Sequence, residues 1–387
     1  MKKILLVIII LFITGCNYRE LNDIAVVTAI SVDRDKDGYK TIVQVINPTK
    51  EQDSTSSGEP DFITYTSTGK TLQESFRKVM LESPRKIYGS QMQLLIIGEE
   101  LARDGIGDIL DFFFRDPEIR FNFNVVVEKK NSDNKAIKTL TVLDNLSSSN
   151  IMDSIKNASN YIGNSIDVTF EDLMNMYLYD NLEIVLPSIY AIGNDNYNND
   201  SNLSSTSNYS KVIVSNLSIF KDDKLQGYLT FNESIGYNFI TDNIKDTLVS
   251  FECDNGRYLV SEIINNNSDI ETDVIGRKII VTIHGNASIN ENNCDYNLKE
   301  SSEIETINKM VNNKIEELVS NSANSIRNKY NSDIFGFRDL FYKKDYKEYN
   351  NIKSVWYEDV FNDIEVEVKS DIKLVEKGNI VGGIHDQ

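Results

Sequence analysis

The stretch that most limits how this chain can fold lies at its start, where two lysines precede an unbroken run of ten apolar residues, 4–13. A helix that crosses a bilayer needs about 20 apolar residues, so this run has half the required length. A basic start followed by a short apolar stretch is typical of a secretory signal. We therefore predict that the rest of the chain is exported and folds outside the cytoplasmic membrane.

The four residues that end the apolar run make this prediction more specific. Residues 13–16 (ITGC) place an apolar residue and two small ones directly before a cysteine. This order is the lipobox of bacterial lipoproteins, in which diacylglycerol alkylates the thiol and the chain is cut before the cysteine. An ordinary signal peptide with an incidental cysteine is the alternative interpretation. We expect residues 1–15 to be removed and Cys16 to carry a covalent diacylglycerol lipid, with no other cofactor.

Charge and length limit the class of protein further. The 387 residues include 40 Lys and Arg against 59 Asp and Glu, for a formal charge of −19. Such an acidic excess argues against a nucleic-acid partner, because phosphate contacts require excess Lys and Arg. Cleavage before Cys16 would remove Lys2 and Lys3, and the formal charge of the mature chain would then be −21. An anionic leaflet would repel this chain as a whole, so two acyl chains would have to hold it at the membrane.

Periodicity predicts a mixed α+β fold. Runs that alternate or are rich in β-branched residues predict strands, and apolar residues spaced by three and four predict helices. Helical and strand patterns alternate only loosely, which favours α+β domains with mainly antiparallel or mixed sheets and packed helices. The predicted strands are 24–32, 39–46, 92–98, 119–128, 183–192, 211–221, 224–231, 257–264, 276–290 and 364–374, and the predicted helices are 71–82, 99–115, 169–177 and a long one at 303–329.

One break in composition suggests how the chain divides. Residues 194–210 are rich in Asn and Ser and nearly lack aliphatic side chains, as in a solvated linker. This division predicts an N-terminal region, 16–193, and a C-terminal domain, 211–387. The first region could itself divide near 128–145, so two or three domains are expected in all.

Two stretches resemble ligand-binding motifs only in part. Residues 33–38 (DRDKDG) match the first half of an EF-hand loop, but Gln44 stands where the twelfth position needs a bidentate acid. Residues 69–71 (GKT) match the end of a P-loop, but Thr64 stands where that motif needs glycine. We interpret the first as a hairpin tip with three solvated acids and the second as a helix start, and we expect no metal site.

Histidine and cysteine are too scarce for most catalytic groupings. His284 lies in a strand-like run and His385 in the terminal tail, and a structural or exposed role is expected for both. Cys253 and Cys294 are the thiols left after lipidation. Outside the membrane they could form a bridge worth about 2–4 kcal/mol or remain two free thiols. With no catalytic grouping in view, we expect that the protein is not an enzyme.

A dense charge cluster occupies residues 115–120 (RDPEIR), between a predicted helix and a predicted strand. It fits a helix C-terminus at which arginine complements the helix dipole and proline stops the helix. The alternative interpretation is a buried or interfacial network of ion pairs that fixes the corner between helix and strand.

Several ordered motifs together resemble one family along nearly the whole chain. They are similar to the Ger(x)C family, the C-subunit lipoproteins of spore germinant receptors. This chain departs from the family at residues 17–18, where Trp-Asp is usual, and at 89–91, where a histidine is common nearby. The matching stretches are 15–21 (GCNYREL), 25–33 (AVVTAISVD), 68–75 (TGKTLQES), 94–102 (LLIIGEELA), 115–120, 219–221 with 224–229, 332–336 (SDIFG) and Trp356.

The resemblance implies three mixed α/β domains and a non-enzymatic subunit on the outer face of the spore inner membrane. Its implied partners are a polytopic A subunit and a transporter-like B subunit, which together respond to small nutrients. An extracytoplasmic solute-receptor lipoprotein is the alternative, and it would need a ligand cleft between two similar lobes. The residues that the resemblance marks for structural networks or subunit contacts are Arg115, Asp116, Arg120, Asp333 and Gly336.

Overall fold

A computed structural model describes residues 23–36, 38–47, 60–132, 134–144, 146–179, 181–193, 197–204, 210–253, 256–294 and 296–376 of the chain. The predicted signal peptide, Cys16 and His385 lie outside these residues, as do parts of the Asn- and Ser-rich segment. Among the described helices, none combines the length and apolarity needed to cross a bilayer.

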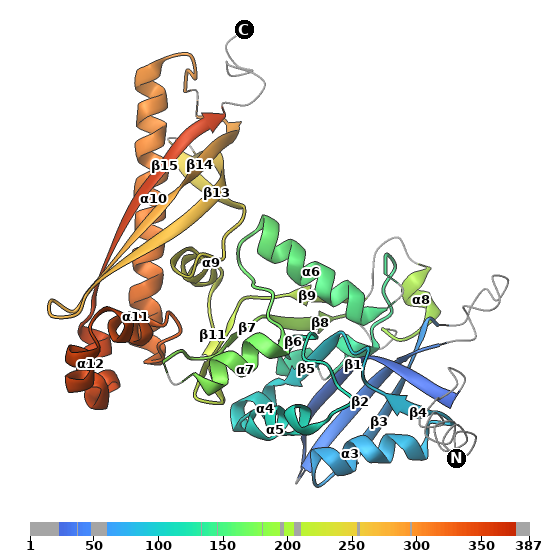
Figure 1. Ribbon diagram of the computed structural model, residues 1–387. Coiled ribbons are helices and arrows are strands. Elements are labelled where there is room, and N and C mark those ends of the chain that lie inside the picture. The colour runs from blue at the N-terminus through green and yellow to red at the C-terminus, as the bar shows by residue number, and fades with distance from the viewer. Residues whose placement is uncertain are drawn as a thin grey trace, which may run out of the picture.

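The first of three sheets has eight strands in a mixed arrangement, with the path β3-β2-β1-β5-β6-β8-β9 and with β4 paired to the start of β1 (Figure 1). β1, β5, β6 and β8 run parallel to one another, whereas β2, β3 and β9 join antiparallel. The strands are β1 (Ile24–Asp35), β2 (Gly38–Ile46), β3 (Phe62–Gly69), β4 (Lys86–Tyr88), β5 (Leu94–Gly98), β6 (Asn124–Glu128), β8 (Ser188–Ile192) and β9 (Lys211–Val214).

Both faces of this sheet are covered, as the continuous apolar character of its parallel strands requires. In β5 the side chains of Leu94 and Ile96 pack on one side with Ile151 and Ile155 of α6 (Ser147–Tyr161). The other face, which includes Leu95, packs against a second group of helices. That group is α3 (Leu72–Lys78), α4 (Glu99–Asp104), α5 (Gly107–Arg115) and α7 (Phe170–Leu178).

A small antiparallel sheet joins the two ends of the molecule. Its order is β11-β10-β7, with β7 (Val185–Leu186), β10 (Ser218–Lys221) and β11 (Lys224–Tyr228). β11 leads into α9 (Phe231–Ile240), whose N-cap Thr230 forms a capping box with Glu233. Gly236 of α9 comes so close to Ser322 that a Cβ atom there would overlap the serine side chain.

The C-terminal part is a four-stranded sheet with one long helix. Its order is β12-β13-β14-β15, antiparallel except for the parallel pair β14–β15. Figure 1 shows α10 running alongside these strands, with α9 nearby. The elements are β12 (Thr247–Cys253), β13 (Arg257–Asp273), β14 (Lys278–Asn292), α10 (Ser301–Tyr330), α11 (Phe337–Lys344), α12 (Tyr346–Ile352) and β15 (Glu365–Glu376).

The predicted fold class is confirmed, because the molecule combines antiparallel and mixed sheets with packed helices. The long C-terminal helix and the first hairpin also lie where the pattern places them. The predicted helix 99–115 is wrong in one respect: it is broken into α4 and α5 at Gly105, whose φ of 132° is a backbone conformation that favours glycine. The predicted strand 183–192 is two strands in different sheets, separated by Pro187, which has no N–H to donate.

The Asn- and Ser-rich segment contains a short helix, α8 (Asp200–Leu203), among its described residues. The strand after the segment, β9, pairs with β8 before it through partners such as Ile189 and Val214. The first sheet therefore continues beyond this segment. The predicted subdivision of the chain into domains stays a prediction.

Candidate functional site

A charged cleft lies at the carboxyl ends of the central parallel strands of the first sheet. This is the edge at which open α/β sheets bind ligands most often. Asp33 is near the end of β1, Glu99 and Glu100 follow β5, and Glu128 ends β6. The cleft has a volume of about 260 Å³. It is lined by four acidic side chains, four basic ones and an asparagine: Asp33, Asp35, Glu100, Glu128, Arg34, Lys40, Lys129, Lys130 and Asn134.

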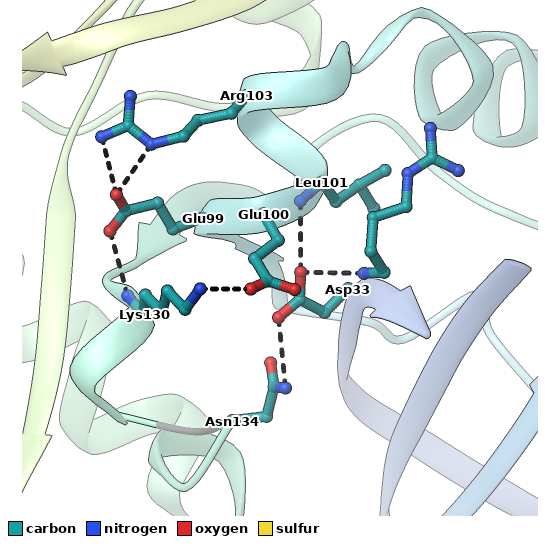
Figure 2. A network of polar contacts seen from close by, with 8 residues as sticks. Asp33, Glu99, Glu100, Leu101, Arg103, Lys130 and Asn134 are labelled. Atoms are coloured by element: carbon teal, nitrogen blue, oxygen red, sulfur yellow. Dashed lines mark hydrogen bonds and ion pairs between the residues drawn. The ribbon is translucent and has the colours of Figure 1, made fainter. Parts of the chain in front are cut away.

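Asp33 is the carboxylate that organises one wall of the cleft. Its Oδ1 accepts hydrogen bonds from the backbone N–H of Arg34 at 2.8 Å and of Leu101 at 3.2 Å, and its Oδ2 accepts one from Asn134 at 3.2 Å (Figure 2). Leu101 lies in the first turn of α4, whose own N-cap residue is Gly98. Asp33 therefore caps this helix from a neighbouring strand. Burial raises the pKa of Asp33, although the three hydrogen bonds act in the opposite direction.

The other wall is a chain of ion pairs between α4 and the turn after β6 (Figure 2). The Nη2 of Arg103 lies 2.7 Å from Oε1 of Glu99, whose Oε2 accepts the backbone N–H of Lys130 at 3.0 Å. The ammonium of Lys130 in turn lies 2.6 Å from Glu100. Hydrogen bonding to Glu100 raises the pKa of Lys130. These contacts hold the start of α4 against the end of β6.

Lys129 links the cleft to the small sheet. Its ammonium donates a hydrogen bond of 2.7 Å to Ser215, directly after β9, and lies 4.3 Å from the centre of the Tyr228 ring at the end of β11. Burial lowers the pKa of Lys129. An aromatic face and a hydroxyl together stabilise the partly buried cation.

The contacts in the cleft favour a structural role, in which paired charges hold β1, α4 and the turn after β6 together. The carboxylates of Asp33, Glu99 and Glu100 have acceptor oxygens engaged by protein donors, as the distances above show. Within the described residues, no group of three or more His, Cys, Asp or Glu side chains is arranged to hold a metal ion.

The interpretation of residues 33–38 as a tip with three solvated acids is wrong for the first of them. Asp33 points into the protein, where it accepts the N–H of Leu101 in a helix whose own N-cap residue, Gly98, has no side chain. Gly98 makes this possible, since a Cβ atom there would overlap the Asp33 carboxylate. A glycine between a buried strand and a helix start was the sequence signal for this contact, but it does not identify which distant carboxylate would fill the space.

The structure does not bring the charge cluster at 115–120 together as a network. Arg115 has a side chain that is 75% exposed and pairs with Asp111 one turn earlier in α5. Asp116 accepts a hydrogen bond from the backbone N–H of Glu118 at 2.9 Å, and Arg120 is exposed. This geometry matches the simpler interpretation, a helix end followed by a turn. Their role as subunit contacts stays a prediction.

Asp333 and Gly336 form one buried corner between α10 and α11. The Asp333 carboxylate accepts the backbone N–H groups of Phe337 at 3.0 Å and Arg338 at 2.7 Å, and so caps α11. Gly336 precedes α11 with a φ of 70°, in the left-handed region that favours glycine. Burial raises the pKa of Asp333 to about 7. Nearby, the Tyr357 hydroxyl donates to Glu183 at 2.6 Å.

The two remaining cysteines are joined in the structure. Cys253 at the end of β12 forms a disulfide with Cys294 after β14, with their Cα atoms 6.0 Å apart. His284 lies in β14 between two carboxylates, 3.5 Å from Asp269 and 3.6 Å from Asp371, where it joins neighbouring strands. Residues 69–71 form the predicted helix start, with Thr71 accepting the N–H of Glu74.

Removing the disulfide should destabilise the C-terminal sheet. The bridge closes a loop across 41 positions, and a crosslink of this span contributes about 2–4 kcal/mol. We expect the double variant Cys253→Ser, Cys294→Ser to show a lower midpoint in urea unfolding. The unmodified protein treated with a reductant is the control and should shift equally. An unchanged midpoint in both samples would show that the bridge does not stabilise the fold.

Comparison with known proteins covers both halves of the chain. Residues 17–191 match the family described as spore germination protein N-terminal domain, and residues 215–378 match the one described as spore germination B3/GerAC like, C-terminal. The chain belongs to the Ger(x)C family. Proteins of this family are germinant receptor C subunits and act in spore germination.

Relatives in the Ger(x)C family match over almost their whole length. Spore germination protein KC of Bacillus subtilis (strain 168) is 24% identical, with 97% of this chain and 95% of the relative covered. Spore germination protein B3 of the same organism is 21% identical over 96% of each chain. The crystal structure of the GerBC protein matches with a TM-score of 0.54 at 16% identity, covering 90% of this chain and 97% of that one.

Proposed function

We propose that this chain is the lipid-anchored C subunit of a nutrient germinant receptor and that it assembles with membrane A and B subunits without performing chemistry of its own. The observation that carries the proposal is the family match over both halves of the chain, together with the lipobox before Cys16. The ion pairs Glu99–Arg103 and Glu100–Lys130 beside the cleft also support a structural role without chemistry. The subunit would be held on the outer face of the spore inner membrane.

A solute receptor is a weaker candidate. That class would need a cleft between two similar lobes. The eight-stranded mixed sheet and the four-stranded C-terminal sheet differ in strand number and in order, so they do not form such a pair of lobes. The charged cleft lies at the edge of the first sheet, where Lys129 connects it to the small sheet, and not between two lobes.

The lipid anchor is tested by replacing its cysteine. We expect Cys16→Ala to leave the membrane fraction of spores and to slow nutrient germination strongly, because no acyl chain would then hold an acidic protein at an anionic surface. Asn17→Ala is the matched control and should behave normally. Mass spectrometry of the N-terminal peptide would show the diacylglycerol directly. Normal germination with Cys16→Ala still at the membrane would contradict the anchor.

Assembly with A and B subunits needs a separate test. A tagged copy of the full chain, extracted from spore membranes in mild detergent, should bring both subunits with it. The recovery of A and B subunits with Cys16→Ala should be compared with the recovery with the native chain, at equal amounts of the tagged protein. Recovery of the tagged chain without either subunit would contradict the assembly and leave the anchor unaffected.

A further inference from the structure

We propose that one particular surface of the first sheet rests on the membrane and binds anionic lipid headgroups. We define the α3–β4 surface as the exposed part of α3, the turn Val79–Leu81, Arg85 and β4. In this arrangement Leu81 enters the bilayer interface, and Arg77 and Arg85 face lipid phosphates. The inference rests on the proposed lipid anchor at Cys16.

The position of the tether selects this surface. Ile24, the first residue of β1, pairs with Lys86 of β4, and Figure 1 shows α3 and β4 along the same border of the molecule. Asp23 is the seventh residue after Cys16, and a fully extended chain over seven residue steps reaches at most about 25 Å. This end of the first sheet must therefore stay close to the lipid surface.

Apolar side chains are exposed on the α3–β4 surface. Leu81 is 84% exposed and Met80 is 41% exposed. Leu81 precedes Lys86 by five residues, so it lies within about 18 Å of the strand that pairs with Ile24. Beside the turn, a groove of about 350 Å³ is lined by both apolar and charged side chains, with Phe76 and Met80 among the apolar ones. A large exposed apolar side chain next to a membrane tether is better placed in the interface than in water.

The charge of this surface differs from that of the whole chain. Residues 72–88 contain four basic and two acidic side chains, in a chain with a formal charge of −19. Lys78 pairs with Glu74 at 2.7 Å, and Lys86 pairs with Glu118 at 2.9 Å. Arg77 and Arg85 form no ion pair with any other residue that the structure describes. Each basic side chain near an anionic leaflet contributes about 1 kcal/mol. The patch thus attracts the surface that the rest of the chain repels, and it orients the protein while the acyl chains hold it.

This orientation also places the charged cleft. Asp33 lies nine residues after Ile24 along β1, and at about 3.3 Å per residue the two are separated by about 30 Å. With the α3–β4 surface on the lipid, the cleft at the far end of the strand faces away from the tether.

The contact can be measured with a fluorophore on the full mature chain, lipidated at Cys16 and bound to vesicles of phosphatidylcholine and phosphatidylglycerol. Leu81→Cys would carry the label, because the other two cysteines form the disulfide. Ile275→Cys, at a position 85% exposed in the turn between β13 and β14, is the matched control. Lipids with a quencher on the acyl chain should quench position 81 several-fold more strongly than position 275.

The outcomes separate this inference from the proposed function. Failure of the chain to bind vesicles would refute the lipid anchor. Firm binding with equal quenching at both positions would refute the α3–β4 contact and leave the anchor intact, and a protein partner would then be the occupant of this surface.

A charge reversal tests the role of the basic residues. The double variant Arg77→Glu, Arg85→Glu should lose most of the quenching at position 81 on the anionic vesicles. Lys245→Glu with Lys353→Glu makes the same change of charge at exposed lysines elsewhere and should leave the quenching unchanged. Equal losses in both double variants would mean that overall charge, and not this patch, sets the orientation.

Discussion

Replacing Asp333 with alanine is expected to lower the free energy of unfolding by about 3 kcal/mol, because two backbone N–H groups lose the carboxylate that accepts their hydrogen bonds. The groups belong to Phe337 and Arg338, and Asp333 as a whole residue is 1% exposed. Urea unfolding followed by circular dichroism would measure the loss. Glu271→Ala removes an exposed acid from β13 and is the control, with a change below about 0.5 kcal/mol. Equal stability of both variants would refute the capping role of Asp333.

The same carboxyl should make stability depend on pH. Its pKa is raised to about 7 by burial, above its value in the unfolded chain, so the folded protein keeps a proton that the unfolded chain has released. The stabilisation is complete below the unfolded pKa, near 4, and is lost as pH rises through 7, by up to about 1.4 kcal/mol per pH unit.

Asp333→Asn isolates this effect, because it keeps one acceptor oxygen and cannot ionise. Between pH 5 and pH 8 we expect the native chain to lose about 2 kcal/mol more than the asparagine variant. Parallel stability curves for the two proteins across this range would contradict the raised pKa. The comparison cancels contributions from the other titratable groups, which both proteins share.

Gly98→Ala is the second change with a large expected effect. The new methyl group would overlap the carboxylate of Asp33, which must then leave its position and release the N–H of Leu101 at the start of α4. Overpacking costs about 1–3 kcal/mol, and the lost helix cap about 1 kcal/mol more. We expect an unfolding free energy lower by about 2–4 kcal/mol in total.

A double-mutant cycle distinguishes this overlap from a general intolerance of alanine. In the background of Asp33→Ala the space is already vacant, so adding Gly98→Ala should cost little. The two changes should therefore be strongly non-additive, as is usual for residues in contact. Additive losses would show that Gly98 and Asp33 are energetically independent.

Regular patterns made some of the fold predictable. The helix α10 shows a long apolar stripe through Ile307, Val311 and Ile315 because only one side of it is buried. The helix α9 was missed because it is buried almost all round, including polar residues such as Glu233 and Asn238, and so presents no stripe. The helix α6 was missed because its sequence is rich in Ser and Asn, which are weak helix formers.

The candidate site was less predictable than the fold, for a physical reason. Several contacts that build the cleft join residues far apart in the chain, as those of Asp33 with Leu101 and Asn134 do. A local motif cannot reveal such a partner. The corner at Asp333 is an exception, because the carboxylate caps a helix only four residues away, and the family resemblance had already marked it.

The order in which strands enter the sheets has a mechanical consequence. β7 lies in the small sheet, β8 and β9 lie in the first sheet, and β10 returns to the small sheet. The backbone therefore passes between the two sheets twice within residues 185–221. Neither sheet can detach without breaking strand pairs in the other, so we expect them to melt in a single transition. A pull applied to one sheet would be transmitted to the other sheet through the covalent backbone.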